Sequence, residues 1–251
     1  MVFLVATFVH SGWLLAAQRA AGLDVEFFSS MQLGPGLGLL TTAVLLRRRV
    51  AALLPRPAES PGHLGARLAV AALVMAGFTL LTLALAALAG VRPDHLPYGG
   101  ATLAAFLVIQ FVGACGEEVG WRGFLQPAFR TRLGVVGAAV VVGVIWSAWH
   151  VDRLGDPAVF AGFTLTAIAL SLALALLGGG TWWQRGLVAG FAHWAVNVAL
   201  VLAVDPEPAT GGGSADAIAV FALPPILLGV LVWAGWALGR RRGQPSPSAT
   251  R

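Results

Sequence analysis

Three short stretches place polar side chains within otherwise apolar sequence. Residues 116–124 read GEEVGWRGF, residues 146–150 read WSAWH and residues 193–197 read HWAVN. Carboxylates and imidazoles exchange protons, but a charge at the centre of a membrane helix costs about 2.5–3.5 kcal/mol, so such residues usually face a bundle interior and mark a working site. The strongly polar side chains of the apolar segments are His10, Glu117, Glu118, Arg122, His150, His193 and Asn197.

Helical spacing relates several of these side chains to one another. Glu118 and Arg122 are four residues apart and can pair on one helix face, which lowers the cost of burying both. Glu117 is rotated by about 100° from Glu118, so it need not share that partner and stays available for chemistry. His193 and Asn197, also four apart, project from one face. Polar contacts that merely join helices, at about 0.6 kcal/mol each, do not offset the cost of two adjacent glutamates.

A predicted hairpin brings His150 to the depth of Glu117. The segments that hold these residues are joined around TRLG, whose midpoint lies near residue 133. Glu117 lies sixteen residues before that point and His150 seventeen residues after it. In antiparallel helices that rise about 1.5 Å per residue, both lie roughly 24 Å from the turn and can face each other.

The composition predicts an all-α membrane helix bundle. Hydrophobic residues make up 58% and charged residues 11% of the 251 positions. A soluble domain of this length carries about 25% charged residues, whereas most apolar segments here reach the roughly 20 residues that a membrane-spanning helix needs. The first segment is short, so seven spans remain an alternative to eight. We predict about eight transmembrane helices, at residues 2–17, 27–46, 68–91, 99–126, 133–151, 158–177, 183–204 and 216–239.

The arginines are distributed asymmetrically between the loops. If successive segments alternate across the membrane, twelve arginines fall on one side and three on the other. This positive-inside bias places both termini in the cytoplasm. Because the arginines lie between apolar segments, the net charge of +5 reflects topology, and nucleic acid binding is not expected. Cys115, the single cysteine, is expected to be a small buried hydrophobe.

The three stretches, taken in order, resemble the motifs of a known family. EEVGWR fits EExxxR, WSAWH approximates FxxxH with Trp146 in place of phenylalanine, and HWAVN fits HxxxN. Their order and setting resemble the CPBP family of intramembrane proteases, which includes type II CAAX prenyl endopeptidases and relatives tied to bacteriocin processing or immunity. The predicted catalytic core covers residues 99–204, with N-terminal transmembrane helices at 1–98 and a last helix and disordered basic tail at 205–251.

The resemblance implies hydrolysis of peptide bonds within the membrane. It makes Glu117 the general base and has His150 help to hold and activate the attacking water. It assigns His193 and Asn197 to the oxyanion of the tetrahedral intermediate. The expected partners are the lipid bilayer and a membrane-associated protein or peptide substrate, and the expected location is the bacterial plasma membrane.

Two features of the site stay open in the sequence. Glu117, His150 and His193 match a catalytic zinc set with one open position, yet the same residues work without metal if Glu117 activates water directly. No HExxH motif is present. Arg122 is expected to form a structural pair with Glu118, and its alternative role is to bind a substrate carboxylate.

The sequence also leaves open the side of the membrane to which the site opens and whether the protein is a protease. The arginine bias puts the turn near residue 131 in the cytoplasm and the site far from it, unless the helix is broken near Pro127. CAAX-type relatives act on cytosolic tails, which favours a site open to the cytosol. The alternatives to a protease are a non-catalytic scaffold or immunity factor on the same fold, and a proton-coupled transporter.

Overall fold

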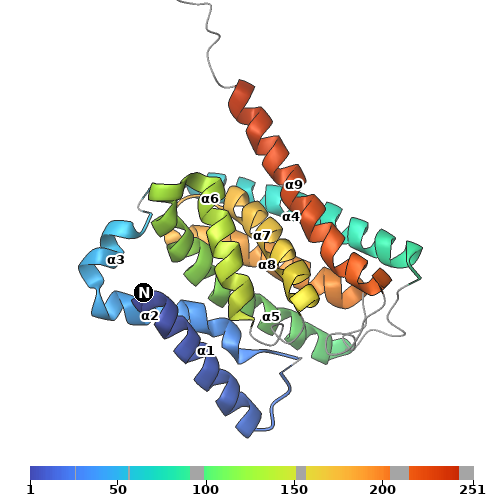
Figure 1. Cartoon of the computed structure of the whole chain (residues 1–251), viewed down its shortest axis with the longest axis horizontal. Helices are drawn as coiled ribbons and strands as arrows, with labels where there is room; N and C mark the ends of the chain where they lie inside the picture. Colours follow the sequence, from blue (N-terminus) through green and yellow to red (C-terminus); the bar gives the residue numbers. More distant parts are fainter. Residues whose placement is uncertain (26, 56, 91–98, 151–156, 204–214, 243–251) are drawn as a thin grey trace, which may run out of the picture.

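The described part of the chain folds as a bundle of α-helices (Figure 1). The computed structural model describes residues 1–25, 27–55, 57–90, 99–150, 157–203 and 215–242. These ranges contain no β-strand, which confirms the predicted all-α fold. The loop before 215 and the tail after 242, which is predicted to be disordered, lie outside the described residues. The elements are α1 (Val2–Ala20), η1 (Ser30–Leu33), α2 (Gly34–Leu45), α3 (Arg47–Leu53), α4 (Pro61–Leu88), α5 (Gly100–Gly120), η2 (Trp121–Leu125), α6 (Gln126–Trp149), α7 (Pro157–Leu177), α8 (Trp182–Ala203) and α9 (Ala215–Arg242).

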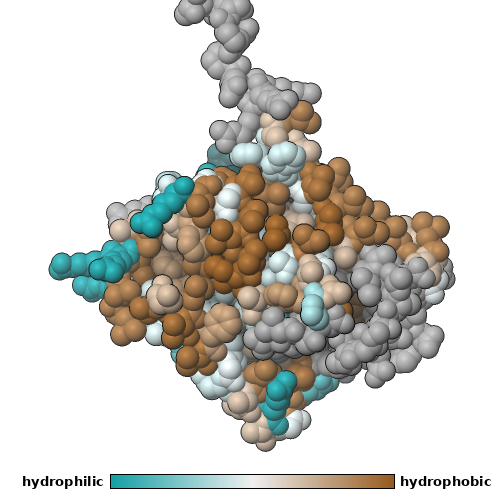
Figure 2. All heavy atoms as spheres, viewed as in Figure 1, coloured by the Kyte–Doolittle hydropathy of each residue, from teal (hydrophilic) through white to brown (hydrophobic). Residues whose placement is uncertain are grey.

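The helices carry the apolar exterior of a membrane protein. Four stretches of the described chain are long and apolar enough to cross a bilayer: α4, Gly100–Trp149, α7 and Ala222–Gly239 of α9. Large hydrophobic side chains on α4 face outward, with Leu73 75% and Leu88 85% exposed. Figure 2 shows hydrophobic residues over much of the coloured surface of one face. The chain is therefore an integral membrane protein with the predicted fold class.

The second predicted span, 27–46, is interrupted in the structure. It begins with the 3₁₀ turn η1 and continues as α2, which has 12 residues. A helix of that length rises about 18 Å, which is less than the hydrocarbon thickness of about 30 Å. Pro35 lies in the first turn of α2, where its missing N–H costs little. The number of helices that cross the membrane therefore stays a prediction.

The predicted hairpin is present, with its bend at Gly134. The stretch from Gly100 to Trp149 is helical apart from Gly134, whose φ of 68° lies in the left-handed region that glycine favours. The helix is not broken at Pro127. Instead the π-helical segment η2, of 5 residues, precedes it. Proline has no N–H to donate to the previous turn, and the wider turn of η2 lies where that bond is missing.

Close packing of α8 on α5 sets the position of His193. Gly186 and Gly190, four residues apart, face α5. A Cβ added to Gly190 would lie 2.7 Å from Sγ and 2.9 Å from Cα of Cys115, which is half-buried at this interface. Small residues at this spacing allow membrane helices to approach closely. His193, one turn beyond Gly190, is thereby brought to α5.

Candidate active site

Glu118 is the centre of a buried charge cluster. Its Oε1 accepts hydrogen bonds from Nη1 of Arg122 at 2.9 Å and from Nδ1 of His193 at 2.9 Å. The predicted pair with Arg122 is therefore present, and both side chains are buried. The contact with His193 connects the EExxxR stretch to the HxxxN stretch, which spacing alone did not predict. Because an ionised carboxylate only accepts, Nδ1 of His193 carries a proton in this contact.

Trp146 connects Glu117 to the same cluster. Its indole Nε1 donates to Oε2 of Glu117 at 2.9 Å, and both residues are buried. The guanidinium carbon of Arg122 lies 4.6 Å from the centroid of the indole ring, which is a cation–π arrangement. The imidazole of His193 meets the indole edge-on, with ring centroids 5.1 Å apart. A phenylalanine, expected at this position in FxxxH, has no N–H for the bond to Glu117.

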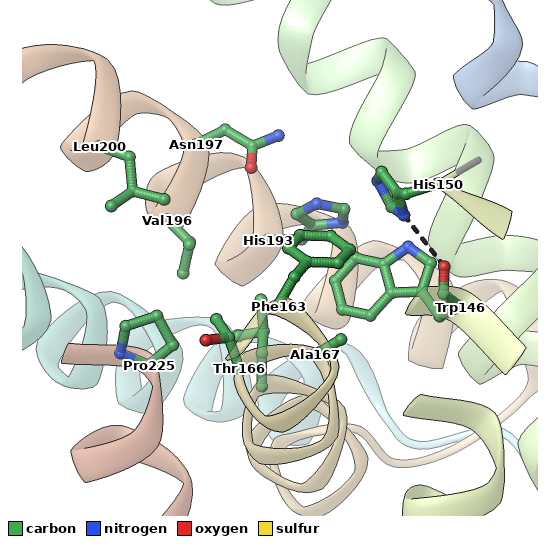
Figure 3. A pocket seen from close by; sticks show the side chains of 11 residues that line it. Trp146, His150, Phe163, Thr166, Ala167, His193, Val196, Asn197, Leu200 and Pro225 are labelled. Carbon is green, nitrogen blue, oxygen red and sulfur yellow. Dashed lines mark hydrogen bonds between the residues drawn. The ribbon is translucent and has the colours of Figure 1, made fainter. Parts of the chain in front are cut away.

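A cavity of about 80 Å³ lies beside the indole of Trp146 (Figure 3). At about 30 Å³ for each molecule, this volume has room for two or three waters. Glu117 is not among the lining residues, and Trp146, which lines the cavity and binds Glu117, is the connection between them. The lining residues are Trp146, His150, Phe163, Thr166, Ala167, Leu170, His193, Val196, Asn197, Leu200 and Pro225.

Both histidines of the cavity are oriented through Nδ1. Nδ1 of His150 lies 3.0 Å from the carbonyl oxygen of Trp146, which can only accept, so this nitrogen carries the proton. Nδ1 of His193 faces the carboxylate of Glu118. In a neutral ring held this way the lone pair is on Nε2, across the ring from the anchored nitrogen. Nε2 is therefore the atom with which the imidazole of His193 can act in the cavity.

Most of the predicted site residues meet at this place. His150, His193 and Asn197 line the cavity together, whereas Glu117 lies behind the indole of Trp146. Several polar atoms in the cluster have no hydrogen-bond partner among the described residues: Oε2 of Glu118, and Nε and Nη2 of Arg122. Buried polar atoms of this kind call for a water molecule or a ligand group.

The walls contributed by α7 and α9 were not predicted. Phe163 of α7 packs against His150 with ring centroids 4.9 Å apart, and Pro225 of α9 closes another side. Thr166 lines the cavity while its hydroxyl donates to the carbonyl of Gly162. No spacing in the apolar stretch 157–177 pointed to these residues. The adjacent prolines inside α9 were the one available signal, because proline is rare within a helix.

The zinc ligand set of Glu117, His150 and His193 is not assembled in this arrangement. In the part of the chain that the structure describes, no three His, Cys, Asp or Glu side chains are grouped so that they could hold a metal ion. Oε2 of Glu117 accepts from Trp146, and Arg122 neutralises the neighbouring Glu118. These residues do not fit a zinc ion as they stand.

The fold and the cluster define a polytopic membrane protein with a buried Glu–Arg–His site next to a small cavity. Residues 99–199 match the family described as Type II CAAX prenyl endopeptidase Rce1-like. This match supports the resemblance to the CPBP family of intramembrane proteases that the motifs predicted. A stretch of 44 residues is 34% identical to CAAX prenyl protease 2 of Methanococcus maripaludis. That similarity covers 18% of this chain and 16% of the relative.

Proposed function

We propose that the protein hydrolyses peptide bonds of membrane-associated substrates inside the bilayer. The observation that carries the proposal is the meeting of the three motifs in one cluster beside the cavity. Trp146 binds Glu117, Glu118 binds His193, and His150, His193 and Asn197 line the space between the helices. The match of residues 99–199 to a family of endopeptidases supports the same activity. The division of the chain into 1–98, 99–204 and 205–251 stays a prediction.

The proposed reaction begins with a water molecule in the cavity. Nε2 of His150 accepts a hydrogen bond from this water, and Glu117 takes a proton from it. A general base must come within about 2.6–3.2 Å of the proton that it abstracts, and such contacts often tighten only when substrate is bound. Because Trp146 lines the cavity and binds Glu117, which does not line it, substrate binding has to shift the indole to open a path to Glu117.

The water oxygen then adds to the carbonyl carbon of the substrate and forms a tetrahedral oxyanion. Asn197 donates to this oxyanion from its amide, and His193 donates from Nε2 in its protonated form. The carboxylate of Glu118 stabilises that imidazolium through Nδ1. Collapse of the intermediate breaks the C–N bond, and the leaving amine takes the proton held by Glu117. Donors aimed at developing charge in a dry site contribute about 10²–10³ each in rate.

A comparison of membrane proteomes tests the proposal and names the substrate. Cells with the wild-type protein are compared with cells that carry Glu117→Ala or His193→Ala, and with a His63→Ala control on an exposed turn of α4. We expect one set of peptide fragments to be lost in both site variants and kept in the control. Identical proteomes with normally folded variants would contradict the proposal.

A non-catalytic scaffold or immunity factor on the same fold is the second candidate. It is favoured by the position of Glu117 outside the cavity lining. Identical proteomes of the wild type and the folded site variants would favour this second candidate. The family match supports CAAX-type specificity, and the arginine bias supports cytoplasmic termini. The location in a bacterial plasma membrane stays a prediction. Zinc use is tested separately by the metal content of the purified protein.

A further inference from the structure

A second cavity lies between the end of α3, the first turns of α6 and the first turn of α8. Its volume is about 370 Å³, and it is lined by Leu53, Pro55, Pro127, Arg130, Thr131 and Arg185. The two charged residues of this lining are both arginines, and none of the six is acidic. The cavity is distinct from the candidate active site, with which it shares no lining residue.

The wall of this cavity is held by a buried glutamine. Gln184 is 2% exposed; its Oε1 accepts from the backbone N–H of Glu59 at 3.0 Å, and its Nε2 donates to the carbonyl of Glu59 at 2.8 Å. These two bonds tie the segment before α4 to the start of α8. The guanidinium of Arg185 is positioned by a bond from Nε to the carbonyl oxygen of Gly180 at 2.9 Å. Its two terminal nitrogens have no partner among the described residues.

No acidic residue of the cavity lining balances the positive charge of the two arginines. Glu59 accepts from Nε of Arg67 on both carboxylate oxygens, at 2.7 and 2.6 Å, so this acid is already paired. α8 has no acidic residue in its first turn, where the helix dipole is positive and an arginine is unfavourable. Arg185 in that turn and Arg130, which is exposed across the cavity, therefore leave a positive charge that an anion can balance.

The surface next to the cavity has the side-chain composition that is typical of a membrane interface. Trp182 and Trp183, in the same turn of α8 as Arg185, are 37% and 46% exposed. Leu53 at the rim is 41% exposed. Tryptophan is enriched at the level of lipid headgroups, and basic pockets between membrane helices bind anionic headgroups. A small free anion would bind the arginines but would not contact the apolar and aromatic side chains around them, whereas a phospholipid would contact both.

We infer that Arg130 and Arg185 form a binding site for the phosphate group of an anionic phospholipid, whose acyl chains lie along the adjacent apolar surface. The planar guanidinium groups donate to the phosphate oxygens, which is the geometry that arginine favours. The bound lipid joins α3, α6 and α8 at this end of the bundle. The inference does not depend on the proposed proteolysis.

Native mass spectrometry and thermal unfolding of the full-length protein test this site. The protein is purified and exchanged into bilayer discs of phosphatidylcholine with increasing fractions of phosphatidylglycerol. We expect retained phosphatidylglycerol and a rising unfolding midpoint for the wild type. Arg130→Gln/Arg185→Gln should bind it at least about tenfold more weakly, because two charged hydrogen-bond donors are lost. Arg19→Gln, an exposed arginine at the end of α1, is the control and should bind like wild type.

Two outcomes would overturn the inference. One is equal binding of phosphatidylglycerol by the double variant and the wild type. The other is equal stabilisation of the wild type by millimolar inorganic phosphate, which would show that a free anion and not a lipid occupies the site. If the double variant fails to fold, Arg130→Gln alone decides the matter, because Arg130 is exposed and its substitution should leave the bundle intact.

Discussion

The indole Nε1 of Trp146 donates to Oε2 of Glu117 at 2.9 Å, so the second motif holds the carboxylate of the first. Phenylalanine at position 146 would keep the ring and lose this bond. The same indole lies against Arg122 and His193 and lines the cavity. In this chain the tryptophan therefore positions the proposed base, in addition to shaping the pocket.

Trp146→Phe should leave Glu117 buried without its donor. We expect it to lower the free energy of unfolding by about 1–3 kcal/mol, the cost of an unsatisfied buried polar group. In a Glu117→Leu background the same change should cost much less, because the partner is already gone. Urea unfolding of the four proteins in detergent measures the coupling. Trp233→Phe, at an exposed position of α9, is the control. If Trp146→Phe lowered the free energy of unfolding equally in the wild type and in Glu117→Leu, the bond between the two side chains would be contradicted.

Gly190→Ala should push α8 away from α5. The added Cβ would lie 2.7 Å from Sγ and 2.9 Å from Cα of Cys115, and a backbone atom cannot move aside cheaply. We expect destabilisation of about 1–3 kcal/mol and loss of the proposed proteolytic activity, since His193 would leave Glu118. Gly77→Ala in α4, where the added Cβ meets nothing within 4 Å, is the matched control. It should be neutral or stabilise by up to about 1 kcal/mol. A variant at Gly190 as stable and active as that control would refute the packing argument.

Removal of one partner of the Glu118–Arg122 pair should be worse than removal of both. Glu118→Leu leaves a buried guanidinium unpaired, which typically costs about 3–5 kcal/mol. Glu118→Leu/Arg122→Leu removes the uncompensated charge, so part of that loss should be recovered. Thermal unfolding in detergent compares the two. The pair would count as energetically unimportant if the single variant were as stable as the double variant.

The pair of Glu59, just before α4, and Arg67 of α4 predicts a dependence of stability on pH. The hydrogen bond from Arg67 holds the pKa of Glu59 below its usual 4.5. A lowered pKa in the folded state gives stability that is present above pH 4.5 and is lost as pH falls through the lowered value. The free energy of unfolding of the wild type should exceed that of Glu59→Gln by up to about 1 kcal/mol at neutral pH, which is typical of ion pairs near the surface. The difference should vanish in acid, and a difference that grows on acidification would have the wrong sign.

Local features of the site were predictable, and tertiary contacts were not. The pairing of Glu118 with Arg122 follows from helical spacing, and the bend at Gly134 lies one residue from the predicted midpoint of the hairpin. Helical spacing placed Glu117 and His150 at the same depth of the hairpin, but it did not give the relative orientation of the two helices. In the structure Glu117 binds Trp146 and not His150. The bond between Glu118 and His193 depends on the close approach of α8 to α5, which no local spacing encodes.

The sequence pattern also did not predict where some helices begin. The apolar pattern of residues 27–46 predicts one continuous span, because hydrophobicity alone does not reveal where a helix begins. The structure starts α2 at Gly34, with Pro35 in its first turn. The π-helical turn at Trp121–Leu125 is likewise a response to Pro127 and to packing, and the motif EEVGWR gives no sign of it.

The most direct test of the account is cleavage in H₂¹⁸O by the protein reconstituted in liposomes, with the substrate that the proteomic comparison identifies. Wild type and Glu59→Gln should both release a fragment whose new carboxylate carries ¹⁸O. Glu117→Gln should slow that release by about 10²–10⁴-fold, which is the usual contribution of a general base. Release at the wild-type rate by Glu117→Gln would contradict the claim that Glu117 activates the water.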